Sequence, residues 1–149
     1  MQTGESGDNW SEMITMTGAK DAEGESQTTL DAAAETLAVH FQQACGDTFG
    51  SQSLGPGTID GHQALLVFLG CGTVAAAQGR VSETAIIIFI KGASGYYSLQ
   101  WAERKPVENS RPVFDATLWN ARNADLSPIR VCERVEGEEP PYPSCIFKQ

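Results

Sequence analysis

The segment SETAIIIFIKGASGYYSLQWAER, residues 82–104, decides the fold. Its first half, residues 83–91, is apolar on both faces of an extended chain and carries a charge at each end. Because a membrane-spanning helix needs roughly 20 apolar residues, this run is too short to be one. The second half, residues 95–104, alternates two sets of side chains: Tyr97, Leu99 and Trp101 against Tyr96, Ser98 and Gln100. The segment therefore predicts a β-hairpin whose first strand is covered on both faces and whose second strand is half exposed.

Upstream of this hairpin, the sequence predicts a strand, a helix and a second hairpin. Residues 9–17, NWSEMITMT, alternate as a strand does, with Trp10, Glu12, Ile14 and Met16 on one side. From Thr29 to Cys45 apolar residues recur at spacings of three and four, which is typical of an amphipathic helix. We expect Thr28 and Asp31 to form its capping box and Gly46 its C-terminal cap. The Asp60-Gly61 turn then predicts paired strands over residues 51–59 and 62–69.

Downstream, a second helix is predicted to begin with Pro112 at its first position and to continue through VFDATLWNAR. Residues 126–132 either add a last strand or lie against the sheet, and the proline- and acid-rich residues 135–145 form a loop. The predicted class is α+β, with a mainly antiparallel sheet flanked by helices as an α/β/α sandwich. Residues 9–149 form one domain, and residues 1–8 are expected to be flexible.

Composition excludes several classes of function. The chain has 149 residues, 41% of them hydrophobic, and a net charge of -9 without any cluster of Lys or Arg. Nucleic acid and anionic membranes attract basic proteins, so neither is an expected partner. The longest apolar run, Ala85 to Ile90, predicts no transmembrane segment. The first residues have neither the basic nor the apolar region of a signal peptide. The cysteines described next lead us to expect a periplasmic or extracellular protein, whose signal peptide is then absent from this sequence.

The four cysteines, Cys45, Cys71, Cys132 and Cys145, contain no C-x-x-C pair. That spacing is typical of structural zinc sites and of thioredoxin-like redox sites. We therefore predict two disulfides in an oxidising compartment, with four buried free thiols as the alternative. Of the three possible connectivities, we favour Cys45 with Cys71, which joins a helix end to a strand end, and Cys132 with Cys145, which closes a short proline-rich loop.

Residues with catalytic or metal-binding chemistry are scattered. His40 and Cys45 lie too far round their helix to form a nucleophile and base, and a zinc site of His40, His62 and two cysteines lacks any typical spacing. Carboxylates can act as acid and base only if the fold joins them, and the candidate pairs are Glu12 with Glu83 and Asp115 with Glu103. We therefore predict no catalytic residue, no cofactor and no metal site.

Two groups of residues are candidates for binding. Tyr96, Tyr97 and Trp101 are aromatic residues of the kind enriched in binding hot spots, although Tyr97 and Trp101 alternate with Leu99 as core residues would. The loop between Cys132 and Cys145 holds the densest acidic cluster, Glu133, Glu136, Glu138 and Glu139. A basic partner would suit this loop, and a solvated loop is the alternative.

The order of these elements, with the NWSEMITM strand, a helix ending in F-x-x-x-C and a DGH-led apolar strand before the long hairpin, resembles bacterial exported proteins of uncharacterised function. Their fold is the PsbP/Mog1/DcrB-like sandwich, and the resemblance covers residues 9–132. It implies a non-catalytic interaction module, since members of that fold are mostly accessory subunits, adaptor proteins and envelope lipoproteins. Together with the cysteines and the absence of catalytic motifs, it leads us to expect an exported domain that binds another envelope or secreted protein, as an accessory subunit, an inhibitor or an immunity factor. The alternatives are a small-molecule or metal-binding domain with a pocket near Tyr96 and Trp101, and a hydrolase.

Overall fold

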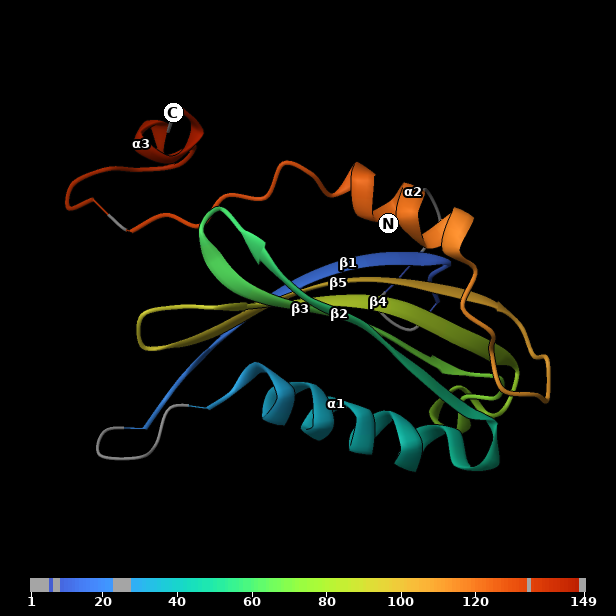
Figure 1. Cartoon of the computed structure of the whole chain (residues 1–149). Coiled ribbons are helices and arrows are strands. Elements are labelled where there is room, and N and C mark those ends of the chain that lie inside the picture. Colours follow the sequence, from blue (N-terminus) through green and yellow to red (C-terminus); the bar gives the residue numbers. More distant parts are fainter. Residues whose placement is uncertain (1–5, 7–8, 23–27, 134, 148–149) are drawn as a thin grey trace.

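A computed structural model describes residues 6, 9–22, 28–133 and 135–147. The five strands run in the order β1-β5-β4-β3-β2, and every neighbouring pair is antiparallel. Their bounds are β1 Glu12–Lys20, β2 Phe49–Ile59, β3 His62–Cys71, β4 Val81–Lys91 and β5 Gly95–Pro106. The helices are α1 Leu30–Cys45, α2 Ala116–Asp125 and α3 Pro143–Ile146, with short 3₁₀ turns η1 Gly46–Thr48 and η2 Ala75–Ala77. Helix α1 lies on one side of the sheet and α2 on the other (Figure 1), which confirms the α+β class and the antiparallel sheet.

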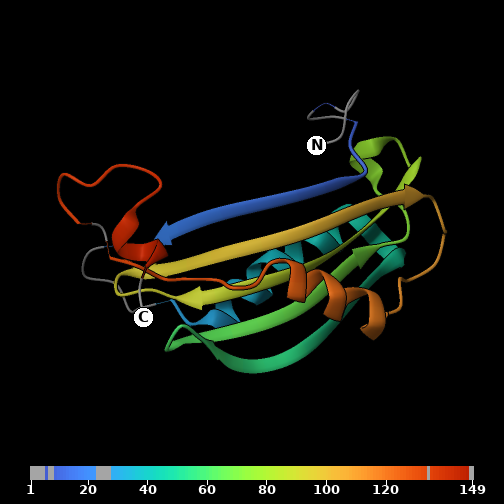
Figure 2. The same cartoon turned by 90° about the horizontal axis from the view of Figure 1, so that it is seen from above.

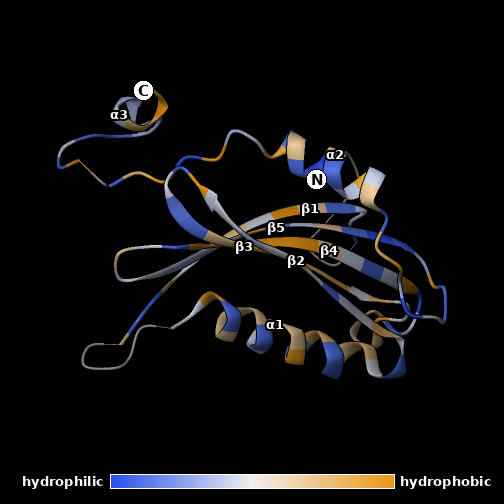
Figure 3. Ribbon diagram, in the orientation of Figure 1, coloured by the Kyte–Doolittle hydropathy of each residue, from blue (hydrophilic) through white to orange (hydrophobic). Residues whose placement is uncertain are grey.

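The β4–β5 hairpin is the centre of the fold, as the sequence predicts. Strand β4 lies between β3 and β5, and its six residues Ala85–Ile90 are at most 3% exposed. Because both neighbours are strands and both faces are covered, apolar side chains are needed in every direction. Figure 3 shows the resulting apolar band along the central strands.

Two apolar clusters fill the space between the sheet and the helices. On the α1 side, alternate residues of β3 and β4 pack against the small side chains of Ala33 and Ala34. On the α2 side, Phe68 and Ile86 pack around the buried Trp119, and the rings of Phe68 and Trp119 lie 5.9 Å apart. Each helix therefore covers mainly the middle of the sheet.

Both predicted disulfides are present with the favoured connectivity, Cys45–Cys71 and Cys132–Cys145. The first joins the end of α1 to the end of β3, and both of its cysteines are buried. The second closes the C-terminal segment, which stands away from the sheet in Figure 1. Among the described residues, no helix has the length and the apolar character needed to cross a membrane.

Three expectations about the first half of the chain need correction. Strand β1 begins at Glu12 and ends at Lys20, later at both ends than expected. Trp10 precedes β1 and lies in the cluster on the α1 side, whereas Glu12 and Ile14 point to the α2 side. The alternation of side chains between the two faces therefore begins only at Glu12, where pairing with β5 begins. The cap of α1 is Thr29, whose hydroxyl accepts from the backbone N–H of Ala32.

The second half of the chain differs in the position of α2. The helix begins at Ala116, capped by the Asp115 carboxylate, and Pro112 is not its first residue. Pro112 instead lies over Gly50 and Gly70, where an added Cβ would meet its atoms at 2.8 and 3.0 Å, so the chain stays extended there. Residues 126–132 form no strand, and the predicted loop contains the short helix α3. The expected flexible N-terminus falls on residues 1–8, which, apart from Ser6, lie outside the described residues.

Candidate interaction surface

Neither helix covers the outer part of the sheet, where β1 pairs with β5. The register places Ile14 opposite Trp101, Met16 opposite Leu99 and Gly18 opposite Tyr97, all with side chains toward the α2 side. Three of these side chains are large, apolar and exposed: Ile14 by 55%, Met16 by 75% and Tyr97 by 45%. We call Ile14, Met16, Tyr97 and the half-buried Leu99 the apolar strip.

An ion-pair network borders one end of the apolar strip. Arg122 of α2 donates from Nε to Glu103 Oε1 at 2.6 Å and from Nη2 to Glu12 Oε1 at 3.2 Å. Its guanidinium also lies 4.9 Å from the ring centre of Trp101. The hydrogen bond to Glu103 raises the pKa of Arg122 above its usual range. Because Glu103 is only 5% exposed, this contact fixes α2 to β5 and gives a buried carboxylate its counter-ion.

The carboxylate pairs considered from the sequence do not form an acid and base. Glu12 points to the α2 side, whereas Glu83 points to the α1 side and accepts from Arg104 Nε at 2.9 Å. Asp115 caps the first turn of α2, and Glu103 binds Arg122 near the other end of that helix. These four carboxylates therefore hold structural contacts.

The cysteines and histidines are likewise not assembled into a reactive site. All four cysteines are in disulfides, so they supply no thiolate to a nucleophile or to zinc. His62 lies with Nδ1 3.1 Å from the Lys91 carbonyl oxygen, and His40 is exposed on α1. Within the described ranges, no group of three or more His, Cys, Asp or Glu residues is arranged to hold a metal ion.

The two aromatic residues singled out from the sequence lie on opposite faces of β5. Tyr96 is half buried on the α1 side, with its ring 6.1 Å from that of Phe89. Trp101 is on the α2 side beneath Arg122, and its buried Nε1 has no hydrogen-bond partner among the described residues. Tyr96 and Trp101 therefore do not form one surface. The expectation that Tyr97 is a core residue is wrong, because no helix covers its part of the sheet and its side chain is 45% exposed.

Sequence reasoning missed Ile14, Met16 and Arg122. Ile14 and Met16 alternate with threonines, which indicates a strand but not which side of it stays bare. For Arg122, the only signal was a basic residue near the end of a short helix. Its partners Glu12 and Glu103 come from strands that only the sheet order brings together.

The predicted acidic loop is anchored at the β2–β3 turn. The backbone N–H of Val131 donates to Asp60 Oδ2 at 2.9 Å, and Arg130 Nη1 lies 3.8 Å from Asp60 Oδ1. Figure 2 shows the segment running from α2 across the sheet to α3. The disulfide between Cys132 and Cys145 closes this loop.

Within the loop, the three glutamates predicted to bind have two kinds of environment. Glu138 accepts hydrogen bonds from the hydroxyl of Ser144 and from its backbone N–H, and these bonds hold the pKa of Glu138 below its usual range. Glu136 and Glu139 are exposed. The exposed acidic side chains of the loop are therefore these two and Glu133, and Glu138 shapes the loop.

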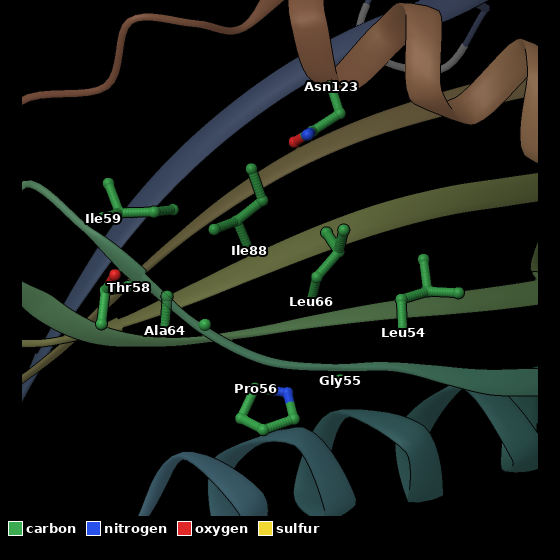
Figure 4. Close-up of a pocket in the computed structure, with 10 residues that line it drawn as sticks. Leu54, Gly55, Pro56, Thr58, Ile59, Ala64, Leu66, Ile88 and Asn123 are labelled. Atoms are coloured by element: carbon green, nitrogen blue, oxygen red, sulfur yellow. The ribbon is translucent and has the colours of Figure 1, made fainter.

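The cavity in Figure 4 lies among β2, β3, β4 and α2. It encloses about 200 Å³, and Leu54, Leu66 and Ile88 give it an apolar floor below Asn123 of α2. A wider, more polar hollow of about 520 Å³ lies beside η1, where Arg111 donates to the Asp47 carbonyl oxygen. A third hollow of about 200 Å³ lies where β1 meets the β4–β5 turn, and Lys20, Gly92, Tyr96 and Tyr97 are among its lining residues. Tyr96 therefore lines a hollow, whereas Trp101 lines none of these three.

No protein-family model, no curated protein and no solved structure matches this chain.

Proposed function

We propose that this chain is a non-catalytic, exported protein-interaction domain that binds another protein through the apolar strip. The observation that carries the proposal is the exposure of Ile14, Met16 and Tyr97 side by side on a sheet face that α2 leaves bare. Contiguous exposed apolar side chains rimmed by polar residues are typical of protein interfaces. A partner that covers them removes apolar surface from water, which favours association.

The two disulfides support a place outside the cytoplasm. Disulfides persist in oxidising compartments and are rare where glutathione keeps thiols reduced. A periplasmic or secreted domain of the PsbP/Mog1/DcrB-like kind, acting as an accessory subunit, inhibitor or immunity factor, agrees with these bonds and with the antiparallel sheet between helices.

The charge of the chain indicates the chemistry of the partner. The net charge is -9, and Glu136 and Glu139 are exposed on the C-terminal loop. A partner with basic residues around an apolar centre would be attracted over a distance and then held by the apolar contact. We therefore expect salt to slow association more than it weakens the formed complex.

The test compares partner capture by matched variants in an envelope extract. Tyr97→Ser removes an aromatic residue from the apolar strip, and Val113→Ser removes an apolar side chain that is 87% exposed elsewhere. We expect the wild type and the Val113→Ser variant to retain the same partner and the Tyr97→Ser variant to lose it. Equal capture by all three proteins contradicts the proposal. A protein that is captured only by a variant that has lost its fold contradicts it as well.

A small-molecule function has less structural support. The apolar cavity in Figure 4 encloses about 200 Å³. Ligand pockets usually enclose about 300–1,000 Å³ and are lined mainly by apolar side chains. The hollow of about 520 Å³ beside η1 falls within that range, but its lining is mainly polar. The apolar strip is therefore the better candidate for binding.

A further inference from the structure

The two edges of the sheet differ in how well they are protected. Along β2 the pairing with β3 shifts between Ser53 and Pro56, Gly55 has a φ of 98°, and Pro56 has no backbone N–H. Bulges and prolines of this kind prevent an edge strand from pairing with another chain. Strand β1 has neither, and it pairs with β5 without interruption from Glu12 to Lys20. Within the described part of the chain, no strand pairs with the outer edge of β1, and this edge is regular.

The hydrogen bonds show which backbone groups of β1 point outward. Arg104 N donates to Ser11 O at 2.8 Å, and Asp21 N donates to Ser94 O at 2.9 Å, so odd-numbered residues bond to β5. In an antiparallel pair, alternate residues point their N–H and C=O groups to opposite edges. The outward groups of β1 therefore belong to its even-numbered residues: Glu12, Ile14, Met16, Gly18 and Lys20.

This set of outward residues is complementary to itself. In an antiparallel pair of two β1 strands centred on Met16, Glu12 faces Lys20, Ile14 faces Gly18 and Met16 faces Met16. Each of these pairs joins outward-pointing groups, so every one is a hydrogen-bonded pair. Opposite charges meet at both ends, and residues 13–19 between them carry no charged side chain. A register displaced by one residue loses an end pair and leaves these charges unmatched.

We propose that two copies of this chain bind each other through β1 in this register and form one continuous antiparallel sheet. Backbone hydrogen bonds supply the attraction, and the Glu12–Lys20 pairs at both ends select the register. The two apolar strips then adjoin on one face, since Ile14 and Met16 of both copies point to the same side. This proposal goes beyond the binding of a different protein, which would meet the strips of two copies at once.

Sedimentation equilibrium across a dilution series measures the association directly. We expect the mass to rise from 16.0 kDa in dilute solution toward twice that value at high concentration. Met16→Lys places two like charges at the centre of the pair and should hold the protein at a single chain mass. Met16 is 75% exposed and its side chain is not in a core cluster, so the variant should fold. Val113→Lys adds the same charge at an exposed apolar site outside β1 and should behave as the wild type does.

A second variant tests the register without altering the apolar strip. Lys20→Glu would face Glu12 at both ends of the pair, and we expect it to raise the dissociation constant of the dimer about tenfold. Arg80→Glu makes the same charge change at an exposed position outside β1 and is the matched control.

Amide hydrogen exchange identifies the strand that pairs. On dimer formation, exchange at the amides of Ile14, Met16 and Gly18 should slow at least about tenfold, whereas Thr15 and Thr17 are protected at every concentration. The proposal is overturned by a single chain mass at all concentrations, or by a dimer that Met16→Lys leaves intact. It is equally overturned if the dimers of the Lys20→Glu and Arg80→Glu variants have the same dissociation constant. It is also overturned if exchange at these amides slows only when a different protein is added. The Tyr97→Ser variant should still dimerise, so loss of the partner and loss of the dimer are separate results.

Discussion

Replacing Arg122 by methionine should destabilise the protein by about 3 kcal/mol, because the substitution leaves Glu103 charged and buried. Glu103 is 5% exposed and accepts the Arg122 Nε–H at 2.6 Å. Removing one partner of a buried ion pair costs about 3–5 kcal/mol. Two features of the site place the cost at the lower end of that range: the Arg122 side chain is 26% exposed, and Lys105 Nζ lies 3.9 Å from Glu103.

The reverse substitution should cost less. In Glu103→Leu, Arg122 keeps its contacts with Glu12 and Trp101 and its access to water, so we expect a loss of about 1 kcal/mol. The double variant Arg122→Met with Glu103→Leu removes both charges and replaces them with apolar side chains. Such replacements are often neutral or stabilising, so the double variant should lie within about 1 kcal/mol of the wild type.

Urea unfolding with both disulfides intact, followed by tryptophan fluorescence, gives the four free energies of this cycle. Trp101 and Trp119 lie on the side of the sheet that α2 covers, so their emission reports the loss of that contact. Two results would refute the reasoning. One is an Arg122→Met protein within about 1 kcal/mol of the wild type, and the other is a double variant as unstable as Arg122→Met alone.

Three further predictions concern the rest of the chain. Replacing Cys45 and Cys71 together by alanine should cost about 3.5 kcal/mol in urea unfolding, since their bond spans 26 residues. Gly72→Ala should cost about 1–3 kcal/mol, because the new Cβ overlaps the Ser110 backbone, whereas Gly57→Ala, with open space around it, should not show this loss. The lowered pKa of Glu138 means that its bonds to Ser144 stabilise the loop fully above the usual glutamate pKa of about 4.3 and are lost as the pH falls through the lowered value. A loss of protection of the Ser144 amide in acid, measured as its exchange rate relative to the intrinsic rate at the same pH, would check this.

Local patterns were enough to predict the centre of the fold. The unbroken apolar run of β4 needs cover on every side, and this requirement gives both the hairpin and the helices on its two faces. The spacing of three and four in α1 reflects the single face that it packs on the sheet. The disulfides followed from the ends of predicted elements, because Cys45 ends α1 and Cys71 ends β3.

The position of α2 depends on contacts that no local pattern records. Pro112 looks like the first residue of a helix, yet two glycines from β2 and β3 leave room for it to lie flat on the sheet. The helix then begins only where Asp115 caps it, and it ends where Arg122 reaches β1 and β5. Since α2 decides which apolar residues are covered, the candidate surface could not be predicted before the sheet order was known.

The contacts that hold the core lie away from the apolar strip. The core clusters are centred on β3 and β4, and β1 contributes to them only through the partly buried Met13. Substitutions at Ile14 and Met16 therefore remove little buried surface. Their side chains contribute much of the exposed apolar surface on this face of the sheet. The Met16 side chain is 75% exposed and belongs to none of the core clusters of the described residues, so a protein that covered it would remove most of its apolar surface from water.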